Sequence, residues 1–345
     1  MASAPRMKSP VIRLGGKTRL LPVLLSVMER MAPHVCYCEP FCGGAVLLFA
    51  KRPSETEIIS DVDRAVYDFF GVMRDPAQAA ELKRRLVYTP WSRDELLACD
   101  ANWRATADRV ERVRQWFAIS RMSFTHEIES PSWWAAKAEN QALRFASSVD
   151  LLDLVAQRLR RVQVDNRSFE HCLKLYDSAN TLFYVDPPYM QSARVDGKYE
   201  HELSDAQHAQ LLDLVLACKG QVILSGYHTP LYDERLAHLP LVEKTRECTI
   251  HNSREHKKSY RTECVWIKAH PFGLFSALDG ADEEGVAEFA RGLSVNQEVS
   301  ADEEAADAVE QGEARTSEGE VEQGEARTQL RNFAVTWEDV TKRFL

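Results

Sequence analysis

The amino-acid sequence predicts an α/β fold, in which short apolar strands alternate with amphipathic helices. Two observations carry this prediction. Apolar runs at 35–39 and 57–60 flank a glycine-containing turn and a helical segment, which is the pattern of a βαβ unit. A further apolar run at 181–185 ends in the turn Asp186-Pro187-Pro188-Tyr189. A chain of 345 residues is long enough to bury a full core and to carry an insertion.

The first predicted element is a helix that follows a Gly-Gly-Lys turn. Gly15-Gly16-Lys17 precedes apolar residues at helical spacing, so a helix is expected from Gly15 to about Met31. The glycines allow close approach of the backbone, and Lys17 can contact an anionic or carboxylate group at the helix start. The turn mimics the end of a P-loop. However, Val11 stands where that motif requires glycine, and no strand precedes the turn.

Residues 35–72 are predicted to form the βαβ unit. A strand at 35–39 leads into the turn Glu39-Pro40-Phe41-Cys42-Gly43-Gly44 and a helix at 45–50. A second strand, at 57–60, ends in Asp61 before another helix. An acidic residue about 20 positions after such a turn commonly binds ribose hydroxyls, although a helix N-cap is the alternative role. Small residues in the turn let a ligand approach the backbone, so the unit predicts a Rossmann-like nucleoside pocket.

Residues 75–149 lose the strand pattern and are predicted to form a helical insert. Basic residues are mixed there with five of the seven tryptophans of the chain: Trp91, Trp103, Trp116, Trp133 and Trp134. This mixture suits a surface that contacts phosphates and stacks on bases. Core aromatics in a solvated basic helical bundle are the alternative, because amphipathic helices have the same pattern.

The α/β pattern resumes near residue 150 and continues to about 270. Helices are expected at 151–161 and 169–176, and strands at 162–165, 181–185, 221–225 and 265–267. Ser204 and Gln207 form a capping-box signature for a helix that runs to Cys218 and is followed by Gly220. A basic stretch precedes the last expected strand.

The Asp186-Pro187-Pro188-Tyr189 turn is the most informative feature of the sequence. Proline fixes its own φ and restricts the residue before it, so this turn is rigid and extended. It can aim a carboxylate oxygen and a backbone carbonyl at one point, beside an aromatic ring. That arrangement suits a planar base that bears an exocyclic amine. The alternative is an ordinary proline-rich strand end with a capping aspartate.

The carboxyl-terminal part of the chain differs in composition from the rest. Residues 271–345 hold 18 acidic and 6 basic side chains, which is a net charge of −12. Since the whole chain has a net charge of −9, residues 1–270 have a net charge of +3. Binding to nucleic acid needs only a local basic patch, so the overall acidity does not exclude it. Residues 271–332 are acidic and of low complexity, contain a heptapeptide at 310–316 that recurs at 322–328, and are expected to be disordered. A short helix is expected at 333–345.

Cysteine spacing and hydropathy limit the location of the protein. The eight cysteines show no paired CxxC spacing, and no signal peptide is evident, so reduced thiols and a cytoplasmic location are expected. Cys36 and Cys38 alternate along a strand and would point to opposite faces, so no metal site is expected. No apolar run approaches the roughly 20 residues that span a bilayer, so no membrane association is expected.

Taken together, Gly15-Gly16-Lys17, the turn at 39–44, Asp61 and the Asp186-Pro187-Pro188-Tyr189 turn resemble the Dam-type family of DNA adenine-N6 methyltransferases, with a class alpha-like motif order. The resemblance covers about residues 8–270. It implies a Rossmann-like S-adenosylmethionine-dependent methyltransferase sheet at 8–74 and 150–270. It also implies that the insert at 75–149 is a helical subdomain for recognition of the DNA target. The acidic tail lies outside the resemblance.

The resemblance implies roles for individual residues. The expected S-adenosylmethionine-binding residues are Arg13, Lys17, Glu39, Phe41, Gly43, Asp61, Phe169 and Asp186. For catalysis, the Asp186 carboxylate and the Pro187 carbonyl would accept the amine hydrogens of adenine, while Tyr189 stacks on the base. The candidates for DNA contact are Arg121, Arg194, Lys198, Lys257 and Lys258. The sequence departs from the family at Arg13, where an aromatic residue is usual, and at Ser168, where aspartate is frequent.

The function implied by the resemblance is site-specific transfer of a methyl group to N6 of a flipped adenine in double-stranded DNA. No metal is required for this reaction, and a cognate restriction endonuclease is a candidate partner. Two alternatives are an RNA or protein methyltransferase with the same cofactor pocket, and a DNA-binding module without turnover. The intact Asp186-Pro187-Pro188-Tyr189 turn weighs against the module.

Overall fold

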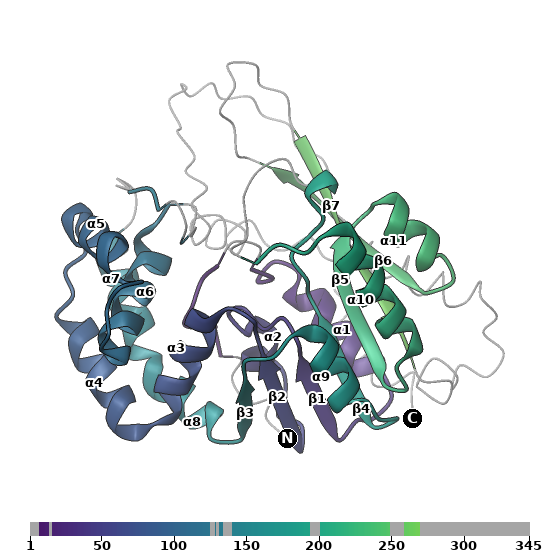
Figure 1. Cartoon of the computed structure of the whole chain (residues 1–345), viewed down its shortest axis with the longest axis horizontal. Helices are drawn as coiled ribbons and strands as arrows, with labels where there is room; N and C mark the ends of the chain where they lie inside the picture. Colours follow the sequence, from purple (N-terminus) through teal and green to yellow (C-terminus); the bar gives the residue numbers. More distant parts are fainter. Residues whose placement is uncertain are drawn as a thin grey trace, which may run out of the picture. The chain divides into compact units, whose positions relative to one another are not determined.

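The computed structural model describes residues 7–13, 16–124, 128, 131–133, 140–193, 201–248 and 259–269 (Figure 1). The expected acidic tail at 271–332 and the expected helix at 333–345 lie outside these residues. Among the described helices, none has both the length and the apolar character needed to cross a membrane.

A seven-stranded sheet forms the centre of the fold, with the order β3-β2-β1-β4-β5-β7-β6. Its strands are β1 (Cys36–Glu39), β2 (Thr56–Ser60), β3 (Val162–Asp165), β4 (Thr181–Val185), β5 (Gln221–Tyr227), β6 (Leu241–Cys248) and β7 (Ser259–Lys268). The first five strands are parallel, and β7 is antiparallel to both β5 and β6. The predicted α/β fold is therefore confirmed, and the carboxyl ends of β1, β2 and β4 meet at one edge of the sheet.

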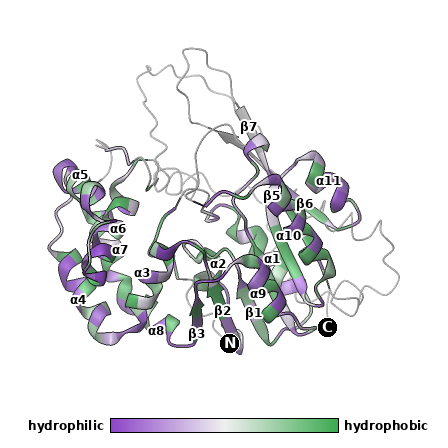
Figure 2. Cartoon of the chain, viewed as in Figure 1, coloured by the Kyte–Doolittle hydropathy of each residue, from purple (hydrophilic) through white to green (hydrophobic). Residues whose placement is uncertain are grey.

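Alternation of side chains along the strands builds an apolar layer on each face of the sheet. Tyr37, Ile59 and Tyr184 belong to one cluster of buried side chains. Cys38, Ile58 and Phe183 belong to the other. The first layer includes side chains of α1 (Leu21–Arg30), α2 (Val46–Ala50), α3 (Arg64–Arg74) and α8 (Leu152–Leu159). The second includes α9 (Phe169–Leu175), α10 (Asp205–Ala217) and α11 (Pro230–Arg235). Figure 2 shows hydrophobic colour along the central strands, consistent with helices on both faces.

The described residues between α3 and α8, where the sequence predicts an insert, form four helices. They are α4 (Pro76–Val87), α5 (Arg93–Asn102), α6 (Arg109–Met122) and α7 (Gln141–Asp150). Trp116 and Phe117 of α6 pack against Phe69 of α3, with ring centroids 5.9 Å apart in both pairs. The alternative interpretation as core aromatics therefore holds for Trp116, and also for Trp103, which is buried.

The buried carboxylate of Asp68, in α3, forms ion pairs with arginines of α6. Arg109 Nε and Arg112 lie 3.0 Å from its two oxygens, and Arg64 Nε lies 3.3 Å from Oδ1. Three guanidinium groups around one carboxylate leave this region of the surface with an excess of positive charge.

The expected elements and the observed ones differ at the first helix, at the strands β6 and β7, and at α11, which was not predicted. The first helix begins at Leu21 rather than Gly15, and Pro22 occupies its first turn, where the missing N–H of proline costs no hydrogen bond. The expected strand at 265–267 is the end of the longer β7, and β6 was not predicted. The capping box of α10 is confirmed: the Ser204 hydroxyl accepts from Gln207 N–H, and the Gln207 side chain accepts from Ser204 N–H.

Candidate active site

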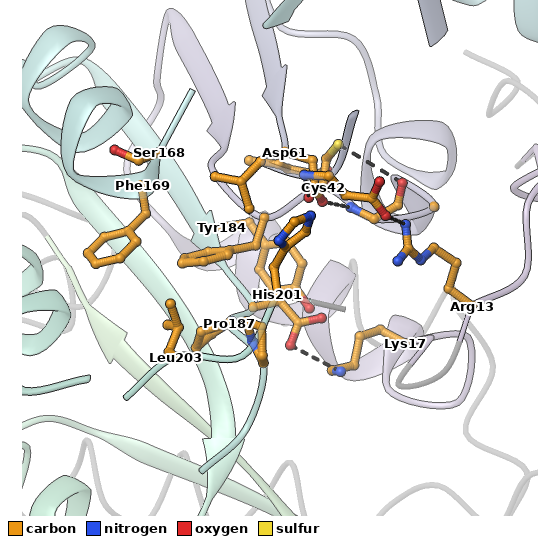
Figure 3. A pocket seen from close by; sticks show the side chains of 18 of the residues that line it. Arg13, Lys17, Cys42, Asp61, Ser168, Phe169, Tyr184, Pro187, His201 and Leu203 are labelled. Atoms are coloured by element: carbon orange, nitrogen blue, oxygen red, sulfur yellow. Dashed lines mark hydrogen bonds and ion pairs between the residues drawn. The ribbon is translucent and has the colours of Figure 1, made fainter. Parts of the chain in front are cut away.

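A cavity of about 460 Å³ opens at the carboxyl ends of β1, β2 and β4 (Figure 3). Ligands collect at this edge in open α/β sheets, because the turns that follow parallel strands converge there. The predicted cofactor residues that line the cavity are Arg13, Lys17, Glu39, Phe41, Gly43, Asp61, Phe169 and Asp186. Pro187 lines it as well. The structure thus brings together every residue of the predicted cofactor set.

The carboxylate of Asp186 is held by two side chains from other parts of the chain. Lys17 Nζ lies 3.0 Å from Asp186 Oδ1, and the side chains of the pair are 6% and 17% exposed. Ser225, in β5, donates a hydrogen bond of 2.7 Å to the same oxygen. Burial raises the pKa of Asp186, whereas Lys17 and Ser225 lower it. These two partners therefore favour the ionised carboxylate that a buried site would otherwise disfavour.

Tyr189 lies beside the cavity and is not among the residues that line it. Its buried ring meets the ring of Tyr227 edge to face, with centroids 4.6 Å apart. Lys17 Nζ lies 4.7 Å from the centroid of the Tyr189 ring. Tyr189 thus contacts the lysine that holds Asp186, and its stacking on a base remains a prediction.

Glu39, the last residue of β1, places a second carboxyl group in the cavity wall. The residue is 1% exposed, and Tyr37 donates a hydrogen bond of 2.7 Å from its hydroxyl to Glu39 Oε1. Burial raises the pKa of Glu39 to about 7, even though the bond from Tyr37 lowers it. The protonation of this carboxyl group therefore changes near neutral pH.

Asp61 follows β2 and fixes the turn that follows β1. Its Oδ2 accepts a hydrogen bond of 2.9 Å from Gly43 N–H, and its Oδ1 accepts one of 3.0 Å from Asp63 N–H. Gly43 has φ of 46°, a left-handed conformation in which glycine is favoured. The N-cap of α3 is Asp63, whose side chain accepts from Ala65 N–H. The alternative role of Asp61 as the helix cap is therefore excluded.

Arg13 connects the cavity wall to the inserted helices. Its guanidinium forms an ion pair with Asp63 and lies 5.8 Å from the centroid of the Trp116 ring. Arg13 is thus paired with a buried carboxylate and lies over a ring of α6. It occupies the position at which the resemblance leads one to expect an aromatic residue.

Phe41 and Phe169 form an aromatic wall of the cavity. Their rings are stacked, with centroids 5.4 Å apart and planes inclined by 25°. Phe41 comes from the turn after β1, and Phe169 begins α9. Ser168 and Glu170 line the cavity next to Phe169. A flat apolar surface bordered by polar groups is suited to a planar heterocycle.

A comparison with protein families agrees with this geometry. The model of the D12 class N6 adenine-specific DNA methyltransferases matches residues 14–250, which is more than half of the chain. The chain belongs to this family. The predicted Dam-type resemblance is confirmed, and the protein is an adenine-specific DNA methyltransferase. No curated protein matches the sequence significantly.

Several residues of the methyltransferase cavity were not predicted from the sequence. His201 and Leu203 line it from the segment that leads into α10, and Gln207 lines it from the first turn of that helix. Ser225 contacts Asp186, and Asp63 pairs with Arg13. Ser225 had one signal, since it occurs in a Ser-Gly-Tyr sequence after an expected strand. His201 and Leu203 had none, because a short segment without periodicity does not indicate which side chains face a cavity.

A second hollow of the methyltransferase, of about 390 Å³, adjoins the first and shares Val62, Asp63 and His201 with it. The side chains that it does not share with the first include the carboxylate of Asp68 and those of Arg64, Arg104, Arg112, Trp103 and Trp116. The Arg104 guanidinium lies 4.3 Å from the centroid of the Trp103 ring. Cationic side chains therefore lie over buried tryptophans beside the cavity.

Of the five residues predicted to contact DNA, only Arg121 is among the residues that the structure describes. Arg194, Lys198, Lys257 and Lys258 lie outside the described residues. Arg121 lies in the last turn of α6, is partly buried, and lines neither of the two hollows. Its contact with DNA remains a prediction.

Proposed function

We propose that this methyltransferase transfers a methyl group from S-adenosylmethionine to N6 of an adenine that is turned out of double-stranded DNA at a specific sequence. The observation that carries the proposal is the meeting of Lys17, Asp186 and Ser225 in a cavity whose walls include the whole predicted cofactor set. The family assignment supplies the adenine and the DNA.

The residues of the cavity fit S-adenosylmethionine. The volume of about 460 Å³ is within the usual range of small-molecule sites. The stacked Phe41 and Phe169 rings offer an apolar surface to the adenine of the cofactor, and Asp61 offers carboxylate oxygens to its ribose. Glu39 provides an acceptor for the amino group of the methionine part. When bound, S-adenosylmethionine supplies a methyl group that is already activated by a positively charged sulfur.

The chain's own groups prepare the acceptor. The lone pair of the adenine amine is delocalised into the ring, so the amine is a poor nucleophile unless its hydrogens are bound by acceptors. Asp186 and the Pro187 carbonyl are the acceptors, and the two prolines fix their direction. A carboxylate aimed at the amine stabilises the positive charge that develops on nitrogen. Burial raises the pKa of that carboxylate, and Lys17 and Ser225 oppose this shift because both lower the pKa.

The inserted helices and the second hollow supply the surface for DNA. Arg64, Arg104 and Arg112 present cationic groups beside the cavity, and lysine and arginine contacts to phosphate dominate the affinity of proteins for DNA. We assign target recognition to residues 75–149, with further contacts from Arg121, Arg194, Lys198, Lys257 and Lys258. Residues 8–74 and 150–270 then form the catalytic and cofactor-binding part, and a cognate restriction endonuclease is the proposed partner in a restriction-modification system.

The test is a methyl-transfer assay on the full-length protein. The enzyme and labelled S-adenosylmethionine are incubated in three separate reactions, with duplex DNA, with RNA and with a protein mixture. The modified positions are then mapped. We expect label in duplex DNA alone, on N6 of adenines that share one flanking sequence. Label in RNA or protein, or none in DNA despite tight DNA binding, would overturn the proposal in favour of the other methyltransferase types or of the binding module.

A further inference from the structure

Three potential metal ligands lie together on the sheet, away from the cavity. One ligand atom each from His228, Glu243 and Cys264 lies within 4.8 Å of the other two. His228 follows β5, Glu243 belongs to β6, and Cys264 belongs to β7. None of these residues lines either hollow described above.

The strand register explains why these side chains meet. Glu243 is paired with Cys264 across β6 and β7, and Gly226 is paired with Cys264 across β5 and β7. Residues paired across strands project from the same face of a sheet. His228 comes two residues after Gly226, and its ring lies beside Trp266, which packs on the same face as Cys264. The strands β6 and β7 thus contribute one ligand each, and the residue that follows β5 contributes the third.

The exposure of the three side chains suits an ion site with an open position. Cys264 is fully buried, so its sulfur lies at the base of the cluster. The side chains of His228 and Glu243 are 43% and 48% exposed, so an ion can reach them from solvent and water can complete its coordination. Ligand atoms in a tetrahedral zinc site are roughly 3.5 Å apart, given bonds of about 2.0–2.3 Å. The two exposed side chains can rotate by the small distance that this requires.

Asp233 orients the histidine from outside the cluster. Its Oδ1 lies 2.7 Å from His228 Nδ1, while His228 Nε2 lies 2.6 Å from Glu243 Oε1. One ring nitrogen thus faces a supporting carboxylate and the other faces the potential ligands. A carboxylate bound to the second nitrogen of a histidine ligand is a recurring feature of zinc sites.

We propose that His228, Glu243 and Cys264 bind a divalent transition metal, with Zn²⁺ as the best match, and that Asp233 positions the histidine. Nitrogen, oxygen and sulfur donors in one site suit zinc, whereas magnesium and calcium prefer oxygen alone. Both the imidazole and the thiol must be deprotonated to bind the ion.

A bound ion would connect β5, β6 and β7 next to the Asp186-Pro187-Pro188-Tyr189 turn. Tyr227, next to His228, packs against Tyr189 of the Asp186-Pro187-Pro188-Tyr189 turn. An ion bound by His228, Glu243 and Cys264 would therefore hold the end of β5 to the antiparallel pair β6 and β7. This inference concerns a site apart from the cavity and does not depend on the proposed function.

The experiment uses the metal-free full-length protein and Co²⁺ as a spectroscopic substitute for Zn²⁺. We expect one equivalent of Co²⁺ to bind with a thiolate charge-transfer band in the near ultraviolet, and Zn²⁺ to displace it. His228→Gln should weaken the affinity by a factor of about 100 or more, and Asp233→Asn by about 10, as for ligands and their supporting carboxylates in other zinc sites. Cys264→Ser should remove the thiolate band.

Cys218→Ser is the matched control, because Cys218 is a buried thiol in the same apolar layer as Cys264 and should leave Co²⁺ binding unchanged. Absence of stoichiometric binding by the unsubstituted protein would overturn the proposal. So would a thiolate band that persists in His228→Gln with unchanged affinity. Since His228 is partly exposed, its substitution decides the outcome even where Cys264→Ser impairs folding.

Discussion

Lys17 Nζ lies 3.0 Å from Asp186 Oδ1, which joins the turn before α1 to the turn after β4. Ser225 donates to the same oxygen from β5. The carboxylate is thus fixed by two partners that are distant from it in the sequence. Both partners stabilise its charged form, which burial disfavours.

The first prediction concerns the acid limb of the pH profile. Lys17→Gln removes the positive charge next to Asp186, so the pKa of Asp186 rises further above its ordinary value. The ionised carboxylate is the active form. The acid limb of the methyl-transfer rate, measured as kcat/KM against pH, should therefore move to higher pH. The control is Lys83→Gln, which removes an ion pair between Lys83 of the insert and Asp153. An acid limb at the same pH in both variants would contradict the role of Lys17 in lowering the pKa of Asp186.

The second prediction concerns Ser225. Ser225→Ala removes one hydrogen bond to a charged group, which is worth about 1.5–3 kcal/mol, or roughly 10- to 100-fold in kcat. The affinity for S-adenosylmethionine should change little, since Ser225 does not line the cavity. Single-turnover rates and cofactor titration measure the two effects. Ser148→Ala is the control, because this buried hydroxyl donates to a backbone carbonyl in α7, and it should affect neither. Equal rates for both variants would refute the assignment.

The third prediction links Glu39 to stability. The pKa of Glu39 is raised from 4.5 to about 7, so the folded state holds this proton where the unfolded chain has lost it. Its contribution to stability is therefore complete below pH 4.5 and is lost as pH rises to about 7. Glu39→Gln cannot ionise. Its stability relative to the unsubstituted protein should grow with pH over this window, by at most about 3 kcal/mol at 1.36 kcal/mol per pKa unit.

Denaturant unfolding of both proteins at pH 5 and pH 8.5 measures this difference. The unsubstituted protein should lose more stability than Glu39→Gln between the two values. A difference in unfolding free energy that is the same at both pH values would show that Glu39 is ionised throughout.

The fourth prediction concerns the aromatic wall. Phe41→Ala removes one ring of the stacked pair with Phe169, and such aromatic contacts contribute about 0.5–1.5 kcal/mol beyond burial. The Kd for S-adenosylmethionine, measured by calorimetry, should rise roughly 2- to 10-fold or more. Phe70→Leu is the control. It perturbs aromatic packing with Phe49 and Phe69, so it should lower stability and leave the Kd unchanged.

The positions of the site turns could be predicted from the sequence because they depend on local patterns. Parallel strands share a direction, so the residues after β1, β2 and β4 had to meet at one edge once the βαβ pattern was recognised. Glu39, Asp61 and Asp186 follow from this rule. The rigid double proline likewise identified Asp186 without knowledge of its surroundings.

Partners that come from distant segments could not be predicted in the same way. Nothing near Arg13 in the sequence indicates that it pairs with Asp63 or lies over Trp116, because both contacts depend on how α3 and α6 pack. The edge-to-face contact of the Tyr189 ring with Tyr227 could not be predicted either, because it depends on the position of the neighbouring strand β5. The edge strand β6 could not be predicted because polar residues interrupt its apolar pattern.

The most direct test of the account is the rate of methyl transfer to duplex DNA by Asp186→Ala. Asp165→Ala is the matched control, since Asp165 ends strand β3 of the same sheet and does not line the cavity. We predict that Asp186→Ala still binds S-adenosylmethionine but forms N6-methyladenine on the order of 100- to 1,000-fold more slowly, while the control keeps its rate. An Asp186→Ala enzyme that methylates adenine at the rate of the unsubstituted protein would contradict the account.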